Sequence, residues 1–200
     1  MSLSERNEIA DDYFSLSLLK CEDDFACEEI QGFDCGKEDL NGFFREDAFG
    51  HQTQLLATTY CFLPQEAKAE NVFHPVALVS FLNDSIVITS DERKKGKKSF
   101  WKRLKVIPFS KRTYASFPAV KIGRLGVRKD LHRKDIGTYL LNLTKHFFLT
   151  ENRTGCRYLT VDAYNDLPTT SFYKKNGFDF LFDQKDIDEE TRIMFFDLKR

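Results

Sequence analysis

Residues 125–138 combine the residue types of an anion-binding turn. Their sequence, LGVRKDLHRKDIGT, begins as a predicted strand, passes through a basic turn and continues as a predicted helix. The basic side chains of the turn are Arg128, Lys129, His132, Arg133 and Lys134. The first turn of a helix has unpaired backbone N–H groups and a partial positive charge, so it attracts anions. A pyrophosphate would suit both the dipole and the charge, although an ordinary strand-to-helix turn with a basic surface has the same pattern.

A second group of candidate residues follows about 40 positions later. The strand predicted over residues 157–163 ends shortly before Asn165, and the short helix predicted over residues 167–175 carries Tyr173. A tyrosine phenol can act as a general acid and give its proton to a thiolate leaving group. The alternative is that Tyr173 is a packing residue of a half-buried helix.

The predicted elements that position these residues follow a mixed order. Strands are expected at residues 54–63, 75–82, 118–127, 157–163, 178–182 and 192–198, and residues 13–20 read as a strand or a short helix. Helical spacing of apolar residues predicts helices at 34–48, 136–148 and 167–175. Asn83 and Asp84 suggest a turn, and Gly123 and Gly126 inside a strand suggest a bulge or a close backbone approach. This order indicates one mixed α/β (α+β) domain over residues 1–200.

The net charge of −1 hides a strong segregation of charge along the chain. Residues 1–50 contain fourteen Asp or Glu against four Lys or Arg, whereas residues 93–112 contain ten Lys or Arg and no acid. We therefore expect a polar lead-in over residues 1–12 and a basic insertion over residues 91–117. The insertion is either a partner site or a solvated loop that the acidic segment neutralises.

Several classes of protein are disfavoured by composition. No run of about 18 apolar residues is present, and the polar, acidic N-terminus does not resemble a signal peptide. The five cysteines are odd in number and lack CxxC spacing, and the four histidines are scattered. These patterns predict a cytoplasmic protein with no membrane partner, no disulfide framework and no metal site.

Taken together, the motifs resemble the GNAT family of N-acetyltransferases over about residues 75–182. The segments that carry the resemblance are LGV, HRKDIGT, LTVDAYN and FYKKNGF, in that order. The resemblance implies a single domain whose central, mixed and mostly antiparallel sheet is flanked by helices and contains a splayed cofactor strand. It also implies acetyl-CoA as co-substrate and transfer of the acetyl group to a primary amine by direct attack.

The resemblance assigns roles residue by residue. The backbone of Leu125, Gly126 and Val127 would bind the pantetheine arm of acetyl-CoA. The pyrophosphate loop would be His132, Arg133, Lys134, Asp135, Ile136 and Gly137, followed by Thr138. Asn165 would lie near the cofactor, and Tyr173 would be the general acid.

Two positions depart from the family's pyrophosphate-loop pattern. His132 stands where the family has Gln or Arg, and it can still donate a hydrogen bond. Asp135 stands at the first glycine of the pattern, so a carboxylate and a Cβ would face the pyrophosphate. Repulsion between the like charges would weaken cofactor binding unless the side chain turns away or nearby cations screen it.

A narrower resemblance is to the toxin acetyltransferases of toxin–antitoxin pairs, which acetylate aminoacyl-tRNA. It rests on DCGKEDLNGFF, VALVSFL and FPAVKIGRLGV. The basic insertion could then hold tRNA phosphates through Lys94, Lys95, Lys97 and Lys98, with Phe100, Trp101 and Phe109 stacking on bases or anchoring the loop.

Three questions stay open at this level. The general base is not evident, and Asp162 is a weak candidate beside water. Asp135 also fits a non-catalytic binding module that has lost the cofactor. The acceptor amine, an antitoxin partner and the oligomeric state are not defined, although a homodimer is a common state among relatives.

Overall fold

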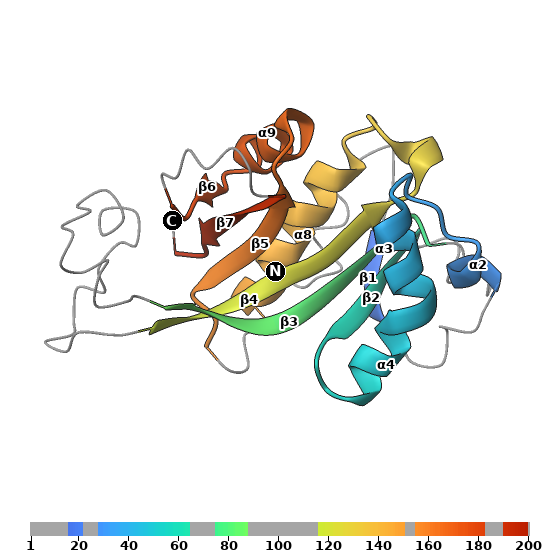
Figure 1. Cartoon of the computed structure of the whole chain (residues 1–200), viewed down its shortest axis with the longest axis horizontal. Coiled ribbons are helices and arrows are strands. Elements are labelled where there is room, and N and C mark those ends of the chain that lie inside the picture. The colour runs from blue at the N-terminus through green and yellow to red at the C-terminus, as the bar shows by residue number, and fades with distance from the viewer. Residues whose placement is uncertain are drawn as a thin grey trace, which may run out of the picture. The chain divides into compact units, whose positions relative to one another are not determined.

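The strands form one sheet in the order β1-β2-β3-β4-β5-β7-β6 (Figure 1). A computed structural model describes residues 16–21, 28–64, 75–87, 116–150, 155–182 and 190–199. The strands are β1 (Leu16–Lys20), β2 (Thr58–Pro64), β3 (Ala77–Val87), β4 (Ser116–Val127), β5 (Tyr158–Tyr164), β6 (Asp179–Phe180) and β7 (Thr191–Asp197). The helical elements are α2 (Glu28–Gln31), α3 (Glu38–Gly42), η3 (Phe43–Asp47), α4 (Ala48–Thr53), η4 (Lys129–Leu131), α8 (Ile136–Thr150) and α9 (Leu167–Lys175).

The sheet is mixed and mostly antiparallel. β1 pairs with β2, β2 with β3, β5 with β7, and β6 with β7, all in antiparallel register. β4 and β5 are parallel, with Ala119 opposite Tyr158 and Ile122 opposite Val161. This parallel pair requires a crossover connection, which contains α8. The expected fold class is therefore confirmed.

The chain divides into two compact units. The first contains the described residues up to Leu82 together with Gly123–Gly137, and the second contains those of Asn83–Ile122 and Thr138–Arg200. β3, β4 and α8 each contribute residues to both units. The expectation of a single domain over residues 1–200 stays a prediction.

The core of the first unit lies between its helices and its strands. α3, η3 and α4 follow one another without a break, and Phe44 and Ala48 are fully buried at the helical spacing expected from the sequence. The ring of Phe44 makes edge-to-face contacts with Phe33 and Phe43. Buried residues of α2, β2 and β3 complete the cluster, including Ile30, Leu63 and Leu78. Burial of this apolar area holds the helices against β2 and β3.

The core of the second unit centres on β5. Residues 158–161 are buried on both faces of the sheet, as expected for a strand that lies between two neighbours and is covered by helices. The ring of Tyr158 makes edge-to-face contacts with Phe117 of β4 and Phe195 of β7. α8 contributes the fully buried side chains of Leu140 and Leu141.

The expected turn at Asn83 and Asp84 is wrong, because both residues lie inside β3. From residue 82 to residue 87 the side chains alternate between more buried and more exposed, which is the period of a strand with one solvated face. The carboxylate of Asp84 accepts a hydrogen bond from the hydroxyl of Thr160. A polar residue is thus accommodated within β3 because Thr160 of β5, on the far side of β4, supplies a donor.

Other boundaries shift by a few residues. α9 begins and ends where it is expected, and the described part of residues 13–20, Leu16–Lys20, is a strand rather than a helix. β2 starts at Thr58 instead of residue 54, because α4 extends to Thr53 and Leu55 turns the chain with a φ of 59°. β4 includes residues 116 and 117, and the rest of the basic insertion and residues 1–12 lie outside the described residues.

Candidate functional site

At Gly126, near the C-terminal end of β4, side chains of the segment before α3 pack closely against the strand. A Cβ added to Gly126 would lie 3.1 Å from both Cβ and Sγ of Cys35, and 3.3 Å from Cε1 of Phe33. The sequence predicted a bulge or a close backbone approach here, whereas the close contact is made by side chains packed against the glycine. It brings the segment that leads into α3 against the strand whose backbone was assigned to the pantetheine arm. Leu125 and Val127, on either side, are half-buried.

The basic turn that follows β4 is fixed mainly by contacts within the first unit. Its first backbone N–H, from Arg128, donates to the carbonyl of Val76 at 2.9 Å. The Arg128 guanidinium makes two hydrogen bonds to Asp130, at 2.7 and 3.1 Å, and lowers the pKa of that carboxyl. Leu131 is buried and anchors the turn in the core.

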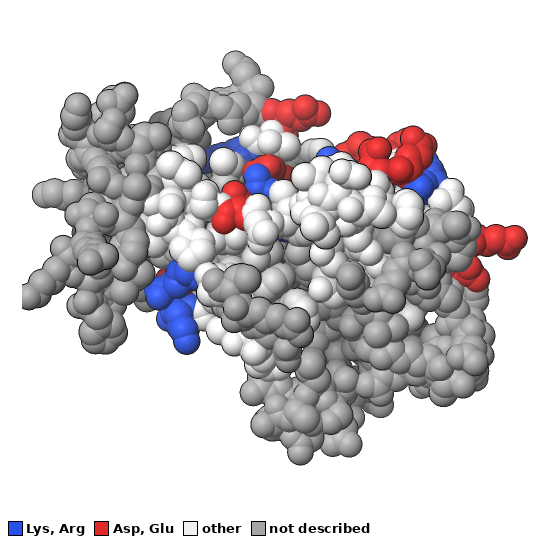
Figure 2. Space-filling view, turned by 90° about the horizontal axis from the view of Figure 1, so that it is seen from below, with Lys and Arg blue, Asp and Glu red and all other residues white. Residues whose placement is uncertain are grey.

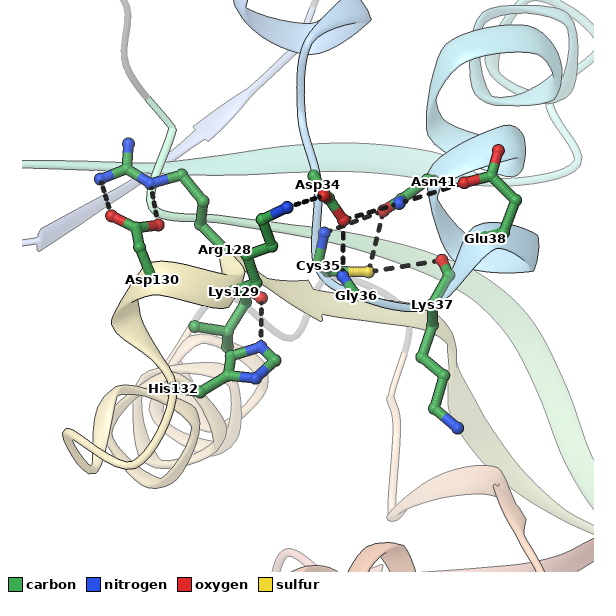
Figure 3. A network of polar contacts seen from close by, with 11 residues as sticks. Asp34, Cys35, Gly36, Lys37, Glu38, Asn41, Arg128, Lys129, Asp130 and His132 are labelled. Carbon is green, nitrogen blue, oxygen red and sulfur yellow. Dashed lines mark hydrogen bonds and ion pairs between the residues drawn. The ribbon is translucent and has the colours of Figure 1, made fainter.

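Lys129 is bound to Asp34 through both its backbone and its side chain (Figure 3). Its N–H donates to the Asp34 carbonyl at 2.9 Å, and its ammonium lies 2.6 Å from Asp34 Oδ2. The ammonium, with the Gly36 N–H and the Asn41 amide, holds the pKa of Asp34 far below its usual range, and Asp34 raises the pKa of Lys129. The carboxylate is therefore ionised at neutral and mildly acidic pH.

His132 also makes a contact inside the protein. Its Nε2 lies 2.8 Å from the carbonyl oxygen of Val127, so that nitrogen carries the proton and donates, because a carbonyl can only accept. The side chain joins the end of the turn to the end of β4 (Figure 3).

Arg133 and Asp135 both adopt the left-handed backbone conformation, with φ of 61° and 55°. Glycine occupies this region without steric cost, and Asp and Asn tolerate it better than most other residues. Asp135 therefore departs from the expected glycine in residue type but retains the backbone conformation that a glycine there would favour. α8 starts at the next residue, Ile136, and its first turn contains no acidic residue.

The cations of the turn are not equivalent. Arg128 and Lys129 are paired with carboxylates, whereas Arg133 and Lys134 form no ion pair with any of the described residues. Both are exposed. At the upper edge of the face in Figure 2, acidic and basic side chains of the described residues also lie side by side. The positive charge that remains available to a ligand is therefore that of Arg133 and Lys134, next to the start of α8.

The other candidate residues belong to the second unit. Thr138, half-buried in the first turn of α8, accepts a hydrogen bond from the Asn176 amide at 3.4 Å. Asn165 follows β5, and its N–H donates to the carbonyl of Glu190 at 2.9 Å. The carboxylate of Asp162 is bound by the Lys121 ammonium at 2.9 Å.

Tyr173 is held on α9 by well-defined helix ends. The Asp166 side chain caps the helix by accepting from the Thr169 N–H at 2.7 Å, and Gly177 leaves it with a φ of 82°. The Tyr173 ring packs against those of Phe172 and Phe178 and is 7% exposed. Burial raises its pKa, so the phenol is protonated at neutral pH. Its role as a general acid stays a prediction.

Asp34 and Asn41 were not among the site residues predicted from the sequence. The available signal was the Asp-Cys-Gly tripeptide, which is typical of a turn in which Asp accepts from the N–H two residues later. Here Asp34 Oδ1 accepts from the Gly36 N–H at 2.7 Å. The contact with Lys129 could not be read from local sequence, because the two residues are far apart in the chain.

Comparisons with known proteins agree with this fold. The model of the acetyltransferase (GNAT) family matches residues 100–178. The chain therefore has the GNAT acetyltransferase fold, and the expected resemblance to this family is confirmed. No curated protein matches the chain in sequence. No helix among the described residues is long and apolar enough to span a membrane.

Similar solved structures include bacterial toxins and their complexes. A tyrosine-to-phenylalanine variant of KacT has a TM-score of 0.66 and 21% identity, covering 92% of this chain and 95% of that one. AtaTR bound with acetyl-CoA has a TM-score of 0.63 and 22% identity, covering 92% and 94%. AtaT complexed with acetyl-methionyl-tRNAfMet has a TM-score of 0.60 and 21% identity, covering 92% and 95%. The narrower resemblance to toxins is thus confirmed at the level of the fold.

The close approach at Gly126 gives a direct test of this part of the structure. Gly126→Ala should lower the free energy of unfolding by about 1–3 kcal/mol, because the added methyl group overpacks the contact with Cys35 and Phe33. Urea unfolding measures the change. Gly50→Ala is the matched control, since nothing lies within 4 Å of a Cβ added there in α4, and it should gain about 0.5–1 kcal/mol. A Gly126→Ala protein as stable as wild type would contradict the contact.

Proposed function

We propose that the protein is an N-acetyltransferase that uses acetyl-CoA. The observation that carries the proposal is the junction of β4, the basic turn and α8. Two left-handed residues there precede a helix whose first turn has no acidic residue, and the exposed cations Arg133 and Lys134 lie beside it. These are the features of a pyrophosphate site. The GNAT fold and the acetyl-CoA in similar structures support the same ligand.

The residues present fit acetyl-CoA. The backbone N–H groups around the start of α8, with Arg133 and Lys134, would hold the pyrophosphate, and Gly137 and Thr138 belong to that first turn. The backbone of Leu125, Gly126 and Val127 would hold the pantetheine arm, and Asn165 would support the cofactor. His132 would contribute by holding the Val127 carbonyl at the end of β4, to which its Nε2 donates. Lys129 is left out of this set because Asp34 already holds its ammonium.

Acetyl-CoA supplies the acetyl group as a thioester, which the acceptor amine attacks directly while coenzyme A leaves as a thiolate. The protein's part is to polarise the thioester carbonyl through a backbone N–H near Val127 and to protonate the departing sulfur from Tyr173. Burial keeps the Tyr173 phenol protonated, as a general acid requires. Because the Asp162 carboxylate is bound by Lys121, we assign removal of the amine proton to water.

For the acceptor we propose aminoacyl-tRNA. Two observations favour it over other amines: the similar structure of AtaT contains acetyl-methionyl-tRNAfMet, and residues 93–112 have ten basic residues and no acid. Those twenty residues lie outside the described residues, so their part in the proposal rests on their sequence. The competing proposal is a non-catalytic binding module that does not use acetyl-CoA. The only feature that favours it is Asp135, the acidic residue in the predicted pyrophosphate loop.

Calorimetry with acetyl-CoA separates catalysis from the binding-module alternative. Wild type should bind saturably, and Asp135→Asn should bind about two- to fivefold more tightly because one exposed carboxylate no longer repels the pyrophosphate. Asp135→Gly removes the Cβ as well, so any further gain over Asn reports steric hindrance. No heat at millimolar acetyl-CoA would refute the proposed function.

The general acid is tested by Tyr173→Phe, which keeps the packed ring and removes only the proton donor. With methionyl-tRNA as acceptor, or another amine that wild type acetylates, kcat should fall about 100-fold or more while acetyl-CoA affinity is retained. Tyr164→Phe, on β5, is the control and should keep wild-type kcat. A Tyr173→Phe enzyme with wild-type kcat would rule out the general-acid role.

The tRNA proposal is tested by charge reversal in the basic segment. Replacing Lys94, Lys95, Lys97 and Lys98 by Glu should weaken tRNA binding at least tenfold and flatten its dependence on salt, because fewer counterions are released. Filter binding across a salt series measures both. Lys174→Glu with Lys175→Glu, on α9, serves as the control. An unchanged salt slope in the fourfold variant would exclude this segment as the tRNA site.

A further inference from the structure

Asp34 is the centre of a polar network that joins two distant segments of the first unit (Figure 3). Its carboxylate accepts from the Gly36 N–H at 2.7 Å and the Asn41 amide at 3.0 Å, and pairs with the Lys129 ammonium at 2.6 Å. Its carbonyl accepts from the Lys129 N–H at 2.9 Å. Lys129 is therefore tied to a single residue by two independent contacts, in a geometry that fixes backbone as well as side chain. We call Asp34, Asn41 and Lys129 the clamp.

The clamp is anchored in the core through Asn41. This side chain is buried on α3, at 4% exposure. Its carbonyl oxygen accepts from the Cys35 N–H at 2.9 Å, and its amide N–H donates to Asp34. A buried amide that uses both of its ends holds its partners in one arrangement. The Asp34 carboxylate is thus positioned by α3 independently of its contact with Lys129.

The segment that the clamp fixes leads directly into the strained part of the turn. Lys129 is the first residue of η4, and the left-handed residues Arg133 and Asp135 follow within a few positions. Left-handed backbone at residues other than glycine costs energy and persists only where the surroundings hold it. The contacts that hold this turn from outside include those of Arg128 with Val76, of Lys129 with Asp34 and of the buried Leu131 with the core, while His132 binds back to Val127.

We propose that Asp34 is a positioning residue for acetyl-CoA. It holds Lys129, and thereby the turn, in the conformation that presents Arg133, Lys134 and the start of α8 to the pyrophosphate. In this assignment Lys129 acts through the clamp and does not bind the ligand. The proposal rests on the proposed function, since it concerns the same acetyl-CoA site.

The two roles of Lys129 make opposite predictions for Asp34. If Lys129 were a pyrophosphate ligand, Asp34 would compete with the ligand for the ammonium, and Asp34→Ala would tighten acetyl-CoA binding or leave it unchanged. If Lys129 acts through the clamp, losing either partner releases the turn. Asp34→Ala and Lys129→Ala should then weaken binding alike, and the double variant should be no weaker than either single variant.

A double-mutant cycle on acetyl-CoA affinity, measured by calorimetry, tests this assignment. Each single variant should raise the Kd about tenfold, and the double variant should lie within about twofold of them, as expected for two residues that act through one contact. Glu46→Gln is the matched control, because it neutralises an exposed carboxylate of η3 that lies outside the clamp. It should bind acetyl-CoA like wild type.

A second measurement needs no ligand. Hydrogen exchange at the Lys129 amide, which donates to the Asp34 carbonyl, should be faster in Asp34→Asn than in wild type and unchanged in Glu46→Gln. Asp34→Asn retains an oxygen for Gly36 and Asn41 and loses only the charge, so it stands in if Asp34→Ala fails to fold. It should raise the Kd as Lys129→Ala does.

The outcomes distinguish this inference from the proposed function. If wild type does not bind acetyl-CoA, both the proposed function and the role of Asp34 as a positioning residue are refuted. If wild type binds and the Asp34 variants bind equally well or more tightly, only the clamp assignment fails. A lower melting temperature with unchanged Kd and unchanged exchange at Lys129 would likewise overturn it, since Asp34 would then be merely structural.

Discussion

The close packing of side chains against the backbone of Gly126 is the constraint on which the rest of the candidate site depends. Because this residue has no side chain, Cys35 and Phe33 pack directly against the end of β4. That contact brings the neighbouring Asp34 within reach of Lys129, only three residues beyond Gly126. A glycine in a strand therefore has a consequence well beyond the strand, because it lets α3 and the turn after β4 share one set of hydrogen bonds.

The electrostatics of the turn follow from this arrangement. A sequence with five basic side chains suggests a strongly positive site, yet Asp130 and Asp34 neutralise Arg128 and Lys129, and His132 binds a backbone carbonyl. The remaining cations, Arg133 and Lys134, lie at the start of α8, where the helix dipole adds to their charge. We infer that the internal pairs shape the turn and that the ligand is attracted by a smaller set of groups than the composition implies.

Local patterns were sufficient for the elements that surround the site. α9 has a capping Asp, an early Pro and a terminal Gly, and both of its ends were predicted. The β-branched and aromatic residues of β5 indicated a strand. β3 was predicted too short because a turn-like Asn-Asp pair is stabilised within the strand by Thr160, a contact that only the sheet creates. The clamp was missed for the same reason. Asp34 and Lys129 meet through tertiary structure, and neither residue type nor spacing along the chain could indicate it.

We propose that the turn after β4 and the start of α8 form the pyrophosphate site of acetyl-CoA, held in place by Asp34. A crystal structure of the full chain with coenzyme A tests this most directly. We expect a pyrophosphate bound by backbone N–H groups of residues 133–138, with Arg133 or Lys134 in contact and Lys129 still paired with Asp34. A pyrophosphate bound by Lys129 after its release from Asp34, or coenzyme A bound elsewhere on the protein, would contradict it.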